Sequence, residues 1–364
     1  MAVPVRRQLQ IWGAFAAFLV VLLWQLGDVL LPFVLGAAVA YFLDPLADWL
    51  ERLGLSRVWA TVTISLVAVL VFALGALLVV PLLIEQARAL VQVAPRAFTE
   101  LTGFLTEKFP DLVDANSTVR QSLNQLGAVI QARGAELVNA VLGSAASVIN
   151  IVLLIVVVPV VAFYLLLDWD PMIARVDALL PREHAPMIRT LAREIDRTVA
   201  SFIRGMGTVC LIMGVFYAVA LMLVGLQFGL VVGAIAGLVT FIPYVGAILG
   251  GVLAIGLGLF QFWGDWVSLG MVAAVFVAGQ SLEGNVITPR LVGRSVGLHP
   301  VWLILALAVF GALFGFVGML VAVPLAAAIG VLMRHATTAY QQSALYTGRN
   351  GSDSESGNDR ADQS

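Results

Sequence analysis

Two long apolar runs in the second half of the chain restrict its fold more than any other feature. They extend over Phe228–Phe262 and Val301–Met333. A helix needs about 20 apolar residues to cross the hydrocarbon core of a bilayer. Each run is therefore too long for one ordinary span and too short for two comfortable spans.

Turn-forming residues interrupt both runs near the middle. The first contains IPYVG at Ile242–Gly246, and the second contains FGFVG at Phe314–Gly318. Proline removes a backbone donor, and glycine permits sharp turns. Half of a run is about 16 residues, or roughly 24 Å of helix, which is less than the hydrocarbon thickness. We therefore expect two re-entrant helical hairpins rather than four short spans, with kinked continuous helices as the alternative.

The composition predicts an all-α polytopic membrane protein. Hydrophobic residues make up 61% of the chain and charged residues 12%, which is far more apolar than a soluble globular protein. No cleavage site closes the first apolar run, so we expect an uncleaved first span. We expect about six full transmembrane helices besides the hairpins, or eight spans if each hairpin counts as one. The six helices are Ile11–Leu26, Val29–Leu43, Val58–Ile84, Ser147–Leu167, Gly205–Leu226 and Val267–Leu282.

Shifts in composition divide the chain into consecutive segments. They are N-terminal transmembrane helices (1–84), an extracytoplasmic helical insertion (85–146), a transmembrane helix (147–167), a cytoplasmic amphipathic helical segment (168–204), a transport core with both hairpins (205–334) and a C-terminal tail (335–364) that we expect to be disordered from about 347.

The placement of arginine and lysine predicts the orientation, because these residues collect on the cytoplasmic side. With a cytoplasmic N-terminus and re-entrant hairpins, 15 basic residues fall inside and 5 outside, which together make the 20 in the chain. Gly205–Leu226 then runs outward before a hairpin that enters from outside. Val267–Leu282 runs inward before a hairpin that enters from inside. Such an inverted repeat with broken helices is the build of secondary transporters.

Two segments carry amphipathic helical patterns. In the insertion, apolar residues recur at spacings of three, four and seven at Val119, Leu123, Leu126, Ile130, Leu137 and Val141. On the inner side, Asp168–Pro171 is typical of a helix start. A later helix has Ile188, Leu191, Ile195 and Phe202 on one side and Arg189, Arg193 and Arg197 on another. Its basic face either contacts anionic membrane lipids or is simply solvated.

Catalysis is not expected. Gly293-Arg294-Ser295-Val296-Gly297 matches the G-x-S-x-G elbow and lies close to His299. That elbow needs a strand before the serine, whereas an apolar helix precedes it here. The sequence has no H-E-x-x-H, P-loop or Cys/His cluster, and its three histidines are scattered. We therefore expect no enzyme, metal or cofactor, and no nucleic-acid partner.

Polar residues beside the expected hairpins are the candidates for a transport site. They are Gln280, Glu283, Asn285, Thr288 and Arg290. Ionisable groups at membrane depth are costly and usually functional. An interfacial ion pair between Glu283 and Arg290 or Arg294 is the alternative. Acidic residues at the predicted span ends are read as interfacial caps: Asp28, Asp44, Asp48 and Asp265.

The segment Gly284–Leu332 closely resembles the signature of the autoinducer-2 exporter family, a group of bacterial multi-pass permease-like proteins. AVAYFLDPLADWL near the N-terminus, FYLLLDWD, IRG at Ile203–Gly205 and FIPYVGAILG at Phe241–Gly250 resemble further landmarks in the family order. The matching motif positions are Pro243, Tyr244, Gly246, Asn285, Pro289, Gly293, His299, Pro300, Gly311, Gly315, Gly318 and Pro324.

The resemblance implies a permease or exporter of a small solute in the bacterial inner membrane and a homo-oligomeric assembly. The charge placement predicts that the N- and C-termini are both cytoplasmic. Family members export the quorum-sensing signal autoinducer-2, and others are sodium or lithium/proton antiporters. We expect an alternating-access transporter in which the hairpin tips and Gln280–Arg290 surround the solute, and in which Asn285–Pro300 is an inner gate. An antiporter with Glu283 as the coupling carboxylate and a non-transporting membrane scaffold are the alternatives.

Overall fold

A computed structural model describes residues 13–14, 18, 25, 27–108, 125, 127, 145–292, 299–343 and 346. The chain forms two compact units. The first comprises Met1–Ala174 and Ile203–Gly293, and the second comprises Arg175–Phe202 and Arg294–Ser364. The two units are described separately below.

The described regular structure is helical throughout, which confirms the all-α prediction. The helices are α2 (Gly27–Arg52), α3 (Arg57–Lys108), α5 (Ala145–Ala178), α6 (Ala185–Leu223), α7 (Gly229–Val239), α8 (Val245–Gln261), α9 (Trp266–Leu282), the π-helical turn η2 (Glu283–Ile287), α10 (Thr288–Leu291) and α11 (Pro300–Gln341).

Six helices in the described part of the chain are long and apolar enough to cross a membrane. Their candidate spans are Val29–Arg52, Arg57–Gly75, Leu154–Ala178, Ala185–Leu223, Trp266–Leu291 and Pro300–Gln341. The first five overlap predicted spans. The predicted span Ile11–Leu26 lies almost entirely outside the described residues. The protein is therefore a polytopic membrane protein.

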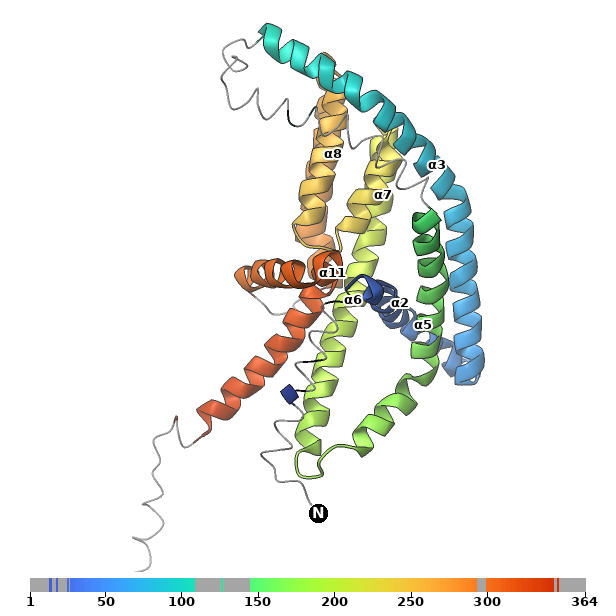
Figure 1. Cartoon of the computed structure of the whole chain (residues 1–364), viewed down its shortest axis with the longest axis vertical. Helices are drawn as coiled ribbons and strands as arrows, with labels where there is room; N and C mark the ends of the chain where they lie inside the picture. The colour runs from blue at the N-terminus through green and yellow to red at the C-terminus, as the bar shows by residue number, and fades with distance from the viewer. Residues whose placement is uncertain are drawn as a thin grey trace, which may run out of the picture. The chain divides into compact units, whose positions relative to one another are not determined.

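The first long apolar run forms a helical hairpin at the predicted break. Figure 1 shows α7 and α8 side by side, joined by a short turn that contains Ile242 and Pro243. Tyr244 adopts a positive φ of 68° at the start of α8. Such a backbone angle is rare for a bulky residue and marks local strain. The break in the run is confirmed, and its re-entry into a bilayer stays a prediction.

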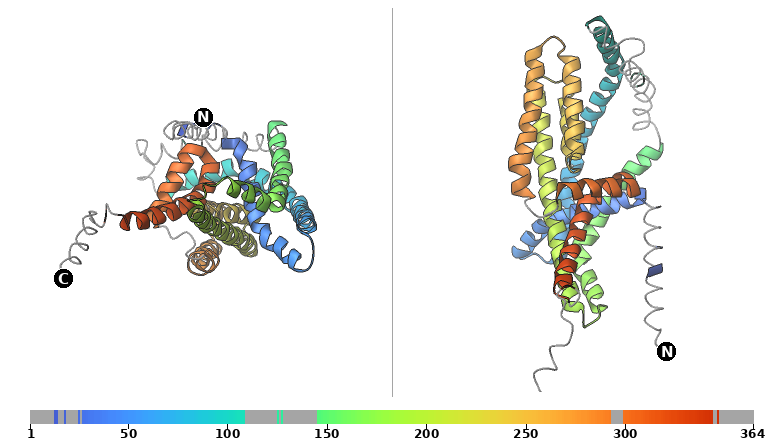
Figure 2. Two further views of the ribbon diagram at one scale, coloured as in Figure 1. Left: turned by 90° about the horizontal axis from the view of Figure 1, so that it is seen from below. Right: turned by 90° about the vertical axis from the view of Figure 1, so that its left-hand side faces the viewer.

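The second long apolar run bends at the other predicted break. Within α11, Gly315 has a φ of 58° and a ψ of −136°, which are not helical angles. Figure 2 shows the two halves of α11 at a sharp angle. Gly318 approaches the carbonyl of Phe310 across the bend so closely that a Cβ at position 318 has no room. Glycine at 315 permits the bend, and glycine at 318 permits the close approach that follows it.

The helices α6 to α9 of the first unit pack through glycine. On α7, Gly233 lies against the backbone of Ala218, and Gly237 lies against Gly214, both on α6. On α8, a Cβ at Gly258 would lie 3.2 Å from Val272 on α9. Small residues at such contacts let helix backbones approach closely, as in other membrane helix bundles. We call residues 203–282 of α6 to α9 the glycine-packed group.

The helices α2, α3 and α5 form a second helix group within the same unit. Their shared core consists of Ala40, Ala47, Ala162 and Leu166, flanked by Val39, Leu43, Ile64 and Leu165. Ala60 and Thr61 of α3 are also fully buried. We call α2, α3 and the part of α5 up to Ala174 the charge-linked group, because an ion network described below joins its helices.

One predicted helix start is wrong. The helix start expected at Asp168–Pro171 does not exist, because α5 continues through Pro171 to Ala178. The helix α6 is continuous from Ala185 to Leu223, so the predicted amphipathic segment and the predicted span Gly205–Leu226 belong to one helix. A proline inside a long helix can be accommodated as a kink, so its local preference for a helix start was overridden. Likewise α3 continues beyond Ile84 into the predicted insertion, to Lys108.

The amphipathic pattern before residue 203 is confirmed where the second unit describes it. Phe202 is buried and Ile188, Leu191 and Ile195 are partly buried, whereas Arg189, Arg193 and Arg197 are exposed. The guanidinium of Arg189 donates hydrogen bonds of 2.6 and 2.8 Å to the carboxylate of Asp177. The apolar stripe from Val119 to Val141, and the tail from Thr347, lie outside the described residues.

Candidate functional site

A small polar cluster lies within the glycine-packed group. The amide nitrogen of Gln280 donates to the hydroxyl oxygen of Tyr217 at 3.0 Å and to the carboxylate of Glu283 at 3.3 Å. Tyr217 belongs to α6 and is 1% exposed, while Gln280 and Glu283 are partly buried at the end of α9. The sequence predicted Gln280 and Glu283 but not Tyr217. We call these three residues the polar cluster.

The ring of Tyr217 is fixed from two sides. It stacks on Phe276 of α9, with ring centroids 5.8 Å apart and an interplanar angle of 22°. The second contact of the ring is with Gly279, where a Cβ would lie 2.5–2.6 Å from two ring carbons and the hydroxyl oxygen of Tyr217. Glycine at 279 is therefore required for the ring to reach Gln280. The sequence signal for Tyr217 was a tyrosine inside an apolar run, which is also typical of ordinary core packing.

The chain leaves α-helical geometry directly after the polar cluster. Glu283 begins the π-helical turn η2, which ends at Ile287 and is followed by the short helix α10. π-helical turns are rare and often occur at functional sites, because the inserted residue changes which side chains face a neighbour. Here the turn lies between Glu283 and the predicted Thr288–Pro289–Arg290 segment.

The remaining predicted residues of this strip do not join the polar cluster. Asn285 is exposed, and its amide donates to the carbonyl of Ser281 on its own helix at 3.0 Å. Pro289 and Arg290 are exposed on α10, and Thr288 is partly buried. Within the described part of the chain, the alternative ion pair between Glu283 and Arg290 does not form. Arg294 lies outside the described residues.

The other predicted positions fall on the two breaks and on a helix cap. Pro243 and Tyr244 lie in the α7–α8 turn, and the backbone of Gly246 packs against Thr240 at its base. In the second unit, His299 caps α11 by accepting a hydrogen bond from the Val301 amide at 3.3 Å. Gly315 and Gly318 make the bend of α11. Residues 293–298 of the predicted gate Asn285–Pro300, with the G-x-S-x-G, lie outside the described residues.

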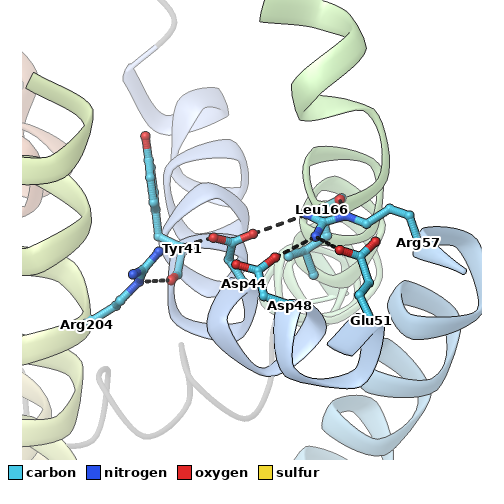
Figure 3. A network of polar contacts seen from close by, with 7 residues as sticks. All are labelled: Tyr41, Asp44, Asp48, Glu51, Arg57, Leu166 and Arg204. Carbon is cyan, nitrogen blue, oxygen red and sulfur yellow. Dashed lines mark hydrogen bonds and ion pairs between the residues drawn. The ribbon is translucent and has the colours of Figure 1, made fainter. Parts of the chain in front are cut away.

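A second polar site, which the sequence interpretation missed, joins the helices of the charge-linked group. Figure 3 shows it. Arg57, the first residue of α3, donates to Asp44 at 3.2 Å, to Asp48 at 2.9 Å and to Glu51 at 3.4 Å. Its Nε also donates to the carbonyl of Leu166 on α5 at 3.0 Å. One guanidinium therefore links α2, α3 and α5.

The same network extends from α2 to the glycine-packed group through Asp44. One oxygen of this carboxylate accepts from Arg57, and the other accepts from Arg204 of α6 at 3.2 Å. Arg204 also donates from Nε to the carbonyl of Tyr41 at 2.8 Å. Asp44 and Asp48 are thus network residues rather than the interfacial caps that the sequence suggested. Asp265 does cap α9, as predicted, and the side chain of Asp28 lies outside the described residues.

Local helix electrostatics point against this arrangement of charges. Three carboxylates lie in the last turns of α2, near its negative dipole end, and Arg57 lies at the positive end of α3. The spacing of Asp44, Asp48 and Glu51, four and three residues apart, places them on one helix face. This combination of spacing and unfavourable dipole was a sequence signal for an ion network. The pairing of these charges in the folded protein compensates for their unfavourable interaction with the helix dipoles.

Long apolar helices, a broken-helix hairpin and a partly buried polar cluster define a multi-pass membrane protein. The chain matches the model of the AI-2E family transporter over residues 14–338. The protein therefore belongs to the AI-2E transporter family.

Individual relatives agree with this assignment. The chain is 30% identical to the Bacillus subtilis protein named as transport protein YrrI, over 88% of this chain and 92% of that protein. It is also 30% identical to the Escherichia coli K12 protein named as permease PerM, over 83% and 85%. A Synechocystis protein named as transport protein sll0060 is 25% identical over 82% and 85%.

Proposed function

We propose that the protein is a secondary transporter that moves a small polar solute across the bacterial inner membrane by alternating access. The observation that carries the proposal is the polar cluster of Tyr217, Gln280 and Glu283 on mostly apolar helices. Polar and ionisable groups within membrane helices are costly and usually mark a substrate or ion pathway. The cluster offers a hydroxyl, an amide and a carboxylate to a solute.

The neighbouring chain geometry supports the same proposal. Two departures from regular helix lie in or next to the glycine-packed group. One is the α7–α8 turn with its strained Tyr244, and the other is the π-helical turn η2 directly after α9. Transporters of several folds bind their solutes where membrane helices are broken. The autoinducer-2 signal is one candidate solute, because the sequence resemblance to autoinducer-2 exporters implies it and the chain belongs to the AI-2E family.

Flux into liposomes tests the proposal. The full-length protein would be reconstituted and assayed with a panel of radiolabelled small polar solutes, with and without imposed proton or sodium gradients. We expect uptake of at least one solute, lowered at least about tenfold by Gln280→Ala and by Glu283→Gln. Glu183→Gln makes the same charge change at an exposed residue and should leave uptake unchanged. Equal uptake by the wild type and the three variants would show that the polar cluster is not the transport site.

A sodium or lithium/proton antiporter is the second candidate. The supporting observation is that the Glu283 carboxylate contacts a neutral amide, whereas Asp44 is held between two arginines. A carboxylate without a cationic partner is the better suited to exchange protons or metal cations. A pH-gradient dye assay on proteoliposomes that shows no response to sodium or lithium would exclude this function. Stable protein partners in a pull-down, together with absent flux, would instead favour a membrane scaffold.

A further inference from the structure

Each helix group of the first unit has its own internal contacts. The charge-linked group is joined by Arg57, and the glycine-packed group by close backbone contacts. Between the groups, Arg204 of α6 reaches Asp44 and the Tyr41 carbonyl of α2. The Asp44 carboxylate is therefore shared by one arginine from each group.

We propose that Asp44 and Arg204 form a latch between the two helix groups, and that this contact breaks and re-forms when the groups move during transport. The inference rests on the proposed function, because only a transport cycle requires such a movement. During this movement the Asp44–Arg57 ion pair stays intact, and the Asp44–Arg204 ion pair breaks.

The exposure of the partners favours opening at Arg204. The side chain of Arg57 is 25% exposed and engages four acceptors, whereas that of Arg204 is 39% exposed and engages two. Breaking an ion contact costs less where water can replace the partner. Loss of Arg57 would also leave three carboxylates close together without their shared cation.

The turn of α6 that carries Arg204 also touches the chain beyond the polar cluster. A Cβ at Gly205 has no room beside the carbonyl of Leu291, at the end of α10. Two residues later, a Cβ at Gly207 would lie 3.2 Å from the ring of Phe42 on α2. One turn of α6 is thus enclosed between α2 and the segment that follows Glu283. Opening the latch would therefore free this turn on the α2 side while it remains packed on α10.

Distances between paired spin labels test the latch without any solute. In a Cys210→Ser background of the full-length protein in lipid nanodiscs, one label pair spans the groups, at Phe33→Cys on α2 and Val215→Cys on α6. A second pair lies within the glycine-packed group, at Val215→Cys and Val277→Cys on α9. All three labelled side chains are at least half exposed. The variants are Asp44→Asn, Arg204→Lys and Arg204→Gln.

We expect the latch variants to raise the minor inter-group distance population about tenfold and to leave the distances within the glycine-packed group unchanged. Glu51→Gln weakens the network inside the charge-linked group only, and should match the parent protein. Unchanged inter-group distances in folded Arg204 variants would overturn the latch, and so would equal broadening of both label pairs. The liposome assay fails independently if the polar cluster is not the transport site.

Discussion

The charge-linked group and the glycine-packed group join their helices with different proportions of ion contacts and close glycine contacts. The charge-linked group has both, because its Gly36 on α2 lies against Val161 of α5. Both must join apolar helices in surroundings where burying apolar area gives little advantage, because lipid is as apolar as the helices. In α6 to α9, missing side chains let the backbones meet. In α2, α3 and α5, one guanidinium collects three carboxylates and a carbonyl.

The difference implies different behaviour. Backbone contacts at glycine are short-ranged and insensitive to salt, and they tolerate no added volume. Ion contacts with partly exposed partners tolerate movement and weaken in salt. We therefore infer that the glycine-packed group moves as one body, while its joint with the charge-linked group can open.

The largest expected effect is a substitution at the α6–α7 contact. Gly237→Val should prevent folding, because a Cβ at Gly237 would occupy the position of the Gly214 backbone on α6. Gly256→Val is the matched control, since a Cβ at Gly256 meets nothing within 4 Å. Size-exclusion profiles after heating would measure the folded fraction. Comparable profiles for the two variants would contradict close packing in this group.

Removing the shared guanidinium should have the next largest effect. Arg57→Ala leaves three carboxylates without their shared cation, and we expect a loss of about 2–3 kcal/mol in the free energy of unfolding. Arg52→Ala removes an exposed arginine in the last turn of α2 and should change it by less than about 0.5 kcal/mol. Thermal unfolding in detergent at low and high salt would measure the loss of stability in both variants. The Arg57 effect should shrink in salt, and a salt-independent loss would argue against an ionic cause.

Adding one methyl group beside the polar cluster should cost less. Gly279→Ala forces the buried ring of Tyr217 to shift, and we expect a loss of about 1–3 kcal/mol. The hydrogen bond to Gln280 should weaken with it. On the same helix, a Cβ at Gly270 meets nothing within 4 Å, so Gly270→Ala should stabilise by about 0.5–1 kcal/mol. Unfolding curves of both variants would test whether the ring is held as tightly as its contacts indicate.

The sequence predicted the part of this comparison that depends on local chemistry. Proline at 243 and glycine at 315 revealed both breaks, because these residues act through their own backbone. The carboxamide and carboxylate of Gln280 and Glu283 were also visible as polar residues at the end of an apolar run. Tyr217 was missed because its role depends on an α6–α9 contact and on the absence of a Cβ at 279.

The charge-linked group was harder to predict for the same reason. Acids at a predicted span end fit interfacial caps, and only the tertiary arrangement brings Arg57, Arg204 and Leu166 to them. Asp265 shows the opposite case. Its cap lies within three residues of sequence, and the structure confirms it.

That cap gives a small pH-dependent effect at the α8–α9 end of the glycine-packed group. Hydrogen bonds from Ser268, first through its hydroxyl and then through its amide, hold the pKa of Asp265 below its ordinary value. A lowered folded-state pKa contributes stability above the unfolded pKa, about 3.9. This contribution is lost as pH falls through the folded value. Melting temperatures from pH 7 to pH 2 should therefore converge for wild type and Asp265→Asn at the acid end. A constant offset would contradict a charge effect.

The smallest expected effect concerns Thr61, a buried side chain of the charge-linked group whose hydroxyl is unsatisfied among the described residues. Thr61 is fully buried on α3, and its hydroxyl has no hydrogen-bond partner among the described residues. Thr61→Val has nearly the same shape and removes the desolvated hydroxyl, so it should be neutral or stabilise by up to about 1 kcal/mol. The matched control is Thr240→Val, because the buried Thr240 hydroxyl donates to the Ala236 carbonyl at 2.8 Å. It should lose up to about 1 kcal/mol. If thermal unfolding showed Thr61→Val to be the more damaging change, the Thr61 hydroxyl would have a hydrogen-bond partner in the folded protein.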